Sequence, residues 1–137
     1  MNSDFIMQYL GKPWSNPAEA HTAEGYDCYS LVKDVYKKQL GLELPPITFD
    51  ACDIKKSAEF FGTETFKTDF KSVDFPTNYD IVLTRGRGYR HVGLWYNNRI
   101  LHSVKGLGCM YSYPSDLKTM GFNDITYKRY KHEINHS

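Results

Sequence analysis

Three side chains in this 137-residue sequence have the chemistry of a thiol-based hydrolytic site, namely Cys28, His91 and His102. Thiolate catalysis needs a sulfur nucleophile, an imidazole that takes its proton and returns it to the leaving amine, and a polar group that orients the imidazole. Cys28 follows Asp27, whose carboxylate makes a good helix N-cap, so the sulfur is expected at the first helical position. The helix dipole favours negative charge there, which predicts a lowered pKa for the Cys28 thiol.

The helix that would carry Cys28 is predicted over residues 27–40. Apolar residues recur at three- and four-residue steps and form one stripe, while lysines occupy the opposite face. Gly41 is placed to end the helix, and Pro45 with Pro46 prevents it from resuming. The same pattern allows a simpler interpretation, in which the cysteine is a small buried hydrophobic residue of an amphipathic helix.

The two histidines lie in segments that are typical of a β-hairpin, His91–Tyr96 and Arg99–Val104, joined by an Asn-Asn turn. That turn fixes the register and places His102 opposite Gly93. His91 is two residues from Gly93 and shares its face, so the histidines become diagonal neighbours about 7–8 Å apart at Cβ. The alternative is that both histidines face solvent and belong to unrelated sites.

A zinc site is a competing interpretation of the same residues. Cys28, His91 and His102 could be three ligands, and the fourth would have to be Cys52, Cys109 or a carboxylate. None of these lies at the close spacing of a metal clip, so the sequence predicts no metal and no other cofactor. Three widely spaced cysteines, in a chain that shows no signal peptide, also argue against structural disulfides.

Length and composition predict one α+β domain over residues 1–137. A formal net charge of +1 gives no case for nucleic acid or an anionic membrane as the main partner. No segment is long enough to span a bilayer. Predicted helices come first and strands follow, with the leading helix packed across the sheet. The further elements expected are helices at Ser3–Leu10 and Asp50–Phe61, strands at 80–84, 110–113 and 125–130, and a helical turn at Ser115–Met120.

Two blocks of the sequence, in this order, resemble the NlpC-type cell-wall cysteine peptidases. The first runs from Gly25-Tyr26-Asp27-Cys28 to Leu44-Pro45, and the second comprises Tyr79–Leu83, His91–Tyr96 and Ile100–Ser103. The likeness spans about residues 9 to 130. It implies a papain-like α+β fold, with Cys28 as the nucleophile, His91 as the base and His102 as the orienting partner.

The resemblance also implies a reaction, the hydrolysis of a peptide bond in bacterial peptidoglycan stem peptides, often between D-glutamate and diaminopimelate or lysine. The backbone N–H of Cys28 would meet the oxyanion, with Trp14, Asp27 and Tyr29 as further candidates for the oxyanion hole or substrate binding. Two departures stand out. Tyr29-Ser30 replaces the usual Ser-Gly, which could narrow the cleft, and Trp14 replaces a frequent Tyr, so that position has no phenol.

Within the family, Gly11-Lys12-Pro13-Trp14 and the lack of a visible signal peptide most resemble the branch from tail tips of lambda-like phages and prophages. This implies synthesis in the cytoplasm and action on the cell wall, as a virion component or a delivered effector. The implied partners are tail-tip or secretion-apparatus proteins.

Two other functions stay open, a catalytically idle structural part of a tail tip and a papain-like thiol amidase or acyltransferase. The order of cysteine before histidine argues against the permuted relatives.

Overall fold

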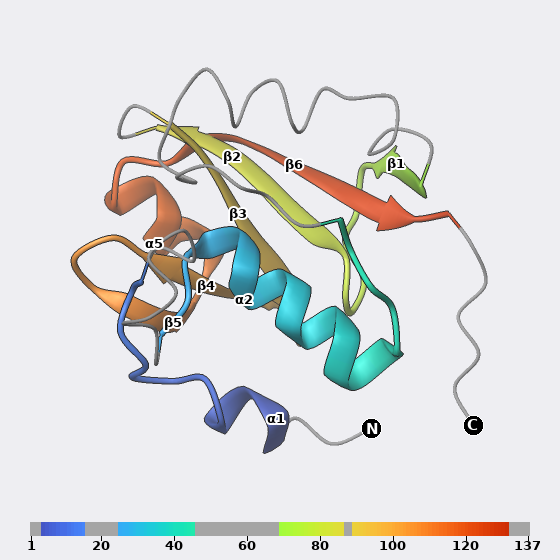
Figure 1. Cartoon of the computed structure of the whole chain (residues 1–137). Helices are drawn as coiled ribbons and strands as arrows, with labels where there is room; N and C mark the ends of the chain where they lie inside the picture. The colour runs from blue at the N-terminus through green and yellow to red at the C-terminus, as the bar shows by residue number, and fades with distance from the viewer. Residues whose placement is uncertain (1–3, 16–24, 46–68, 87–88, 132–137) are drawn as a thin grey trace.

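A computed structural model describes residues 4–15, 25–45, 69–86 and 89–131 of the chain. Helices precede a run of strands, which confirms the predicted α+β order (Figure 1). The elements are α1 Asp4–Met7, α2 Cys28–Val35, the π-helical turn η2 Tyr36–Leu40, β1 Phe70–Val73, β2 Ile81–Gly86, β3 Tyr89–Tyr96, β4 Arg99–Val104, β5 Gly108–Ser112, α5 Pro114–Thr119 and β6 Asn123–Tyr130. The helix predicted at Asp50–Phe61 lies outside the described residues.

The strands form one six-stranded sheet in the order β1-β6-β2-β3-β4-β5, and every neighbouring pair is antiparallel. The last strand of the chain, β6, inserts between β1 and β2, so its pairing joins segments far apart in sequence. Helix α2 packs against β3 and β4, the two strands that carry the histidines (Figure 1). Among the described residues, no helix is long and apolar enough to cross a membrane.

Helix α2 begins as the sequence predicts. The Asp27 carboxylate accepts a hydrogen bond from the Ser30 backbone N–H at 2.7 Å, and the Ser30 hydroxyl accepts one from the Asp27 N–H at 2.9 Å. This reciprocal pair is a capping box, and it fixes Cys28 as the first helical residue. The predicted end is also confirmed, because Gly41 adopts a left-handed conformation with φ of 68°. The final turn differs from the prediction, since it widens into the π-helical η2 before Gly41.

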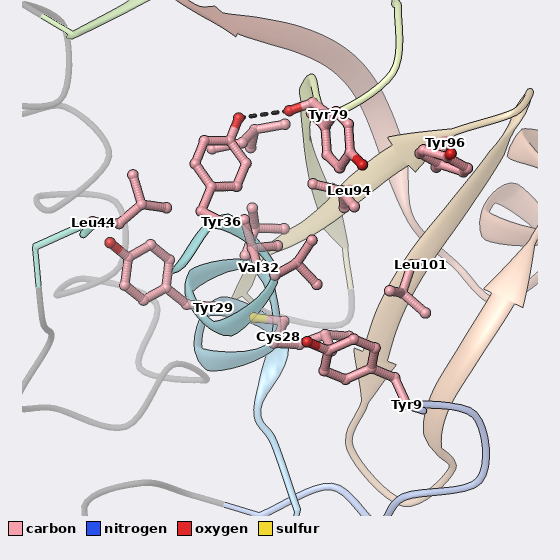
Figure 2. Packing of buried hydrophobic residues seen from close by; sticks show 14 of the residues in the cluster. Tyr9, Cys28, Tyr29, Val32, Tyr36, Leu44, Tyr79, Leu94, Tyr96 and Leu101 are labelled. Atoms are coloured by element: carbon pink, nitrogen blue, oxygen red, sulfur yellow. Dashed lines mark hydrogen bonds between the residues drawn. The ribbon is translucent and has the colours of Figure 1, made fainter. Parts of the chain in front are cut away.

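Two hydrophobic clusters lie against the sheet. The larger one joins α2 to strand residues that include Val92, Leu94 and Tyr96 (Figure 2). Side chains alternate along a strand, and Trp95 of the same strand packs against the other cluster. This smaller cluster is built from Val82, Ile100, Val104, Leu117 and Phe122. Phe122 of this cluster also stacks on the ring of His91.

The β3–β4 hairpin has the predicted turn and register. Asn97 and Asn98 both have positive φ, and Tyr96 pairs with Arg99. A Cβ built on Gly93 would lie 2.6 Å from Ile100 Cγ2 and 3.2 Å from His102 Cβ. The absent side chain therefore leaves room for the Ile100 side chain and the Cβ of His102.

We predict that Gly93→Ala lowers the free energy of unfolding by about 1–3 kcal/mol, because the added methyl would overlap buried, stiff atoms. Urea unfolding measures the effect. Combining it with Ile100→Ala, which removes the nearest overlapping atom, should recover part of the loss in a double-mutant cycle. A Gly93→Ala protein as stable as the parent would show that the hairpin faces are not packed as described.

Candidate active site

The core of the candidate site is a direct contact between the two histidines. Nε2 of His91 lies 2.8 Å from Nδ1 of His102, and the ring centroids are 5.1 Å apart with an interplanar angle of 70°. Both side chains have 0% exposure. The interpretation that they face solvent at unrelated sites is therefore wrong, and the diagonal arrangement expected from the hairpin register is present.

His102 has a second partner on the next strand. Its Nε2 lies 2.9 Å from the hydroxyl oxygen of Ser112 on β5. Both nitrogens of the His102 ring are thus used, one toward His91 and one toward Ser112. The result is a continuous hydrogen-bonded row across β3, β4 and β5, with His91 at one end.

The surroundings of the pair keep His102 neutral. Burial lowers the pKa of His102 to about 4, while the carboxylate of Asp116 acts in the opposite direction. On the other side of the row, the ring of Phe122 stacks on His91 with centroids 4.2 Å apart and an angle of 13° between the planes. Stacking fixes the plane of the His91 ring and places a π-face against it.

Cys28 is held at the start of α2 by contacts to the hairpin. The Ser103 hydroxyl on β4 donates a 2.6 Å hydrogen bond to the carbonyl of Tyr26, two residues before the cysteine. Cys28 itself exposes 2% of its surface and belongs to the larger hydrophobic cluster. Asp27 has 0% exposure and acts as the N-cap. The backbone N–H of Cys28 lies at the start of the helix, where the helix dipole favours an anion.

The segment around Trp14 runs beside the same approach to α2. Trp14 and Tyr26 form an isolated parallel bridge, in which Tyr26 N–H donates to the Pro13 carbonyl at 3.0 Å. A Cβ at Gly25 would lie 2.1 Å from that carbonyl oxygen, so only glycine allows this approach. The Trp14 ring lies under the ammonium of Lys105, which is 5.4 Å from the ring centroid. Trp14 is therefore a neighbour of the segment that leads into Cys28.

Tyr29, the residue after the cysteine, anchors α2 to the chain that follows η2. Its side chain is buried and turned toward Leu44 (Figure 2), and its hydroxyl donates to the Pro45 carbonyl at 2.5 Å. Burial and the nearby Asp27 raise the pKa of the Tyr29 phenol well above its usual value. The residue after the cysteine thus ties α2 to the segment that follows η2.

Three residues of the site were missed by the sequence analysis. Ser112 could have been found by computing the β4–β5 register as for the first hairpin, since Ile100 pairs with Ser112 and His102 with Met110. That register puts Ser112 diagonally across from His102 on one face. Phe122 and Ser103 had no local signal, because their contacts reach across the fold to His91 and Tyr26.

The zinc interpretation requires several ligand side chains close together. The part of the chain that the structure describes contains no group of three or more His, Cys, Asp or Glu side chains that could hold a metal ion. Cys52, one of the proposed fourth ligands, lies outside the described residues. Cys109, another of the proposed fourth ligands, is a buried free cysteine on β5.

Comparison with known proteins identifies the family of the chain. Residues 11–130 match the NlpC/P60 family, so the chain belongs to that family and has its papain-like fold. It is also 31% identical over 93 residues to proteins of Escherichia coli strains K12, O6:H1 and O157:H7, each named murein DD-endopeptidase MepS/murein LD-carboxypeptidase. The match covers 66% of this chain and 43% of each relative. The chain thus matches less than half the length of these relatives, and the tail-tip branch stays a prediction.

We predict that the protein loses stability as the pH falls from about 6.5 toward 4. Above this window His102 is neutral in both the folded and unfolded chains. Within it the unfolded chain binds a proton that folded His102, with a pKa of about 4, does not. The loss should total roughly 3 kcal/mol, at 1.36 kcal/mol for each pKa unit of difference.

Urea unfolding at several pH values tests this prediction. His102→Asn, which cannot titrate, serves as the control for the carboxylates that also titrate at low pH. Its stability should fall less steeply across the window, and equal slopes in the two proteins would contradict a depressed pKa at His102.

Proposed function

We propose that this member of the NlpC/P60 family is a cysteine peptidase that cleaves a peptide bond in bacterial peptidoglycan, with Cys28, His91 and His102 as its triad. The observation that carries the proposal is the buried 2.8 Å contact between the two histidines on the strands against which the Cys28 helix packs. Ser103 adds support, because its bond to Tyr26 O ties the start of that helix to the strand of His102.

In the proposed mechanism, Nδ1 of His91 takes the proton from the Cys28 thiol while Nε2–H donates to Nδ1 of His102. The thiolate attacks the substrate carbonyl carbon, and the backbone N–H at Cys28 stabilises the oxyanion. His91 then gives its proton to the leaving amine, which leaves a thioester on the sulfur. A water molecule, deprotonated by His91, hydrolyses the thioester and restores the thiol.

Two features of the site would assist these steps. The helix start favours the thiolate over the thiol, and the Phe122 ring stacked on His91 fixes the plane of the imidazole. His102 stays neutral because it is buried, so the positive charge stays on His91. Because Cys28 exposes only 2% of its surface, the proposal also requires the substrate to displace side chains that cover the sulfur.

The proposed bond lies within the stem peptide, between D-glutamate and diaminopimelate or lysine, as the family resemblance implies. The E. coli relatives are named for a DD-endopeptidase and an LD-carboxypeptidase, which act at other bonds. Delivery to the wall as a phage tail-tip component or an effector, after synthesis in the cytoplasm, is part of the same proposal.

We predict that the purified protein releases soluble fragments from sacculi and that Cys28→Ala reduces the rate by several orders of magnitude while the fold is retained. Mass spectrometry of the muropeptides identifies the bond. Cys109→Ala, which changes the buried cysteine on β5, should keep the activity. Products cut only at the DD cross-link would contradict the proposed bond, and a wild-type protein without products would favour an idle structural role.

We also predict that iodoacetamide modifies Cys28 faster than Cys109 at pH 7. The two thiols are similarly buried, at 2% and 5% exposure, so a rate difference reports the thiolate fraction rather than access. Burial raises the pKa of the Cys109 thiol, whereas the helix start favours the anion at Cys28. Peptide mass spectrometry after timed labelling measures both rates, and equal rates would count against an activated Cys28.

A further inference from the structure

The hydrogen-bonded row from His91 ends at a cavity. A surface hollow of about 440 Å³ lies between β5 and α5, and its wall includes both Ser112 and Asp116. Ser112 is only 6% exposed and holds Nε2 of His102, so it separates the buried pair from this hollow. Asp116 is exposed on α5, and its carboxylate is the charged group that acts on His102.

We propose that Ser112 and Asp116 are positioning residues that extend the histidine pair into a directed relay. In it, His91 donates to His102, His102 donates to Ser112, and Ser112 donates through water in the cavity toward Asp116. The inference rests on the proposed function, in which His91 must accept a proton from Cys28. The direction of the hydrogen bonds in the row decides whether His91 can do so. Neither residue touches the substrate; both act through the tautomer of His102.

The direction of the row decides whether His91 can act as a base. If Nε2–H of His91 donates to Nδ1 of His102, then Nδ1 of a neutral His91 carries no proton and can accept one. If His102 donates from Nδ1 instead, the proton of neutral His91 sits on Nδ1, and the nitrogen meant for the thiol is blocked. The 2.8 Å contact fits both directions, so something beyond the pair must select between them.

A serine hydroxyl alone does not make the selection, because it can donate to Nε2 of His102 or accept from it. His102 contacts the imidazole of His91 on β3, and the Asp116 carboxylate on α5 is the charged group that acts on it. A negative charge beyond Ser112 favours the arrangement in which every donor hydrogen points toward it. Asp116 accepts the Tyr113 backbone N–H through Oδ2 at 2.9 Å, which holds its carboxyl group at the start of α5.

The test measures the tautomer directly, by ¹⁵N chemical shifts of the histidine rings in the full chain without substrate. In the wild type we expect the proton of His102 on Nε2 and that of neutral His91 on Nε2. Ser112→Ala removes the acceptor and should move the His102 proton to Nδ1. Asp116→Asn keeps the shape of the side chain and should move part of the population the same way. Asp74→Asn makes an equal charge change at the opposite edge of the sheet, and it should leave the ring protons of both His91 and His102 where they are.

Kinetics supply the second readout. Ser112→Ala should lower kcat about 10- to 100-fold with KM within about twofold, and Ser112→Thr, which keeps the hydroxyl, should restore most of it. Asp116→Asn should lower kcat only about two- to fivefold, because an exposed charge is screened. Amide NMR spectra show whether each variant folds. If Ser112→Ala does not fold, the two separate variants Ser112→Thr and Asp116→Asn still test the proposal.

The outcomes separate the two proposals. A wild-type His102 protonated on Nδ1, or variants whose tautomers do not change, overturns the relay even if the enzyme cleaves peptidoglycan. Tautomers that respond as expected in a protein that cleaves nothing support the relay's direction but overturn the proposed function. Unchanged kcat in Ser112→Ala, with an altered tautomer, would show that Ser112 has no positioning role.

Discussion

The site depends on one buried hydrogen bond, the one between Nε2 of His91 and Nδ1 of His102. Two imidazoles without exposure can be accommodated in a hydrophobic surrounding only if their polar nitrogens find partners, because an unmatched buried donor or acceptor costs about 1–3 kcal/mol. Gly93 provides the room for this bond, since any side chain there would overlap Ile100 and His102. The contact between the two histidines therefore depends on the missing side chain at Gly93 as well as on the histidines themselves.

Burial then determines what each imidazole can do. Desolvation keeps His102 neutral near pH 7, so it serves as a dipole that orients its neighbour rather than as a second charge. His91 has the Phe122 ring stacked on one face, which fixes the plane of its imidazole. Two chemically identical side chains therefore acquire different properties from their positions in the row.

The cysteine is positioned by separate constraints. The capping box at Asp27 determines where α2 starts, and the Ser103 bond to Tyr26 O determines where that start lies relative to β4. The close approach of Pro13 to Gly25 adds the N-terminal segment to the same corner. Together these contacts place the start of α2, and with it Cys28, beside the hairpin.

The sequence by itself determined the local features of this protein. The capped start of α2, its end at Gly41 and the register of the first hairpin follow from short-range rules of capping, turns and alternation, and these rules brought His91 and His102 together. Only the tertiary structure decided the rest. Phe122, Ser103 and the insertion of β6 beside β2 depend on contacts between distant segments. Such contacts reflect how buried surfaces fit one another in space, and no periodicity within one segment encodes them.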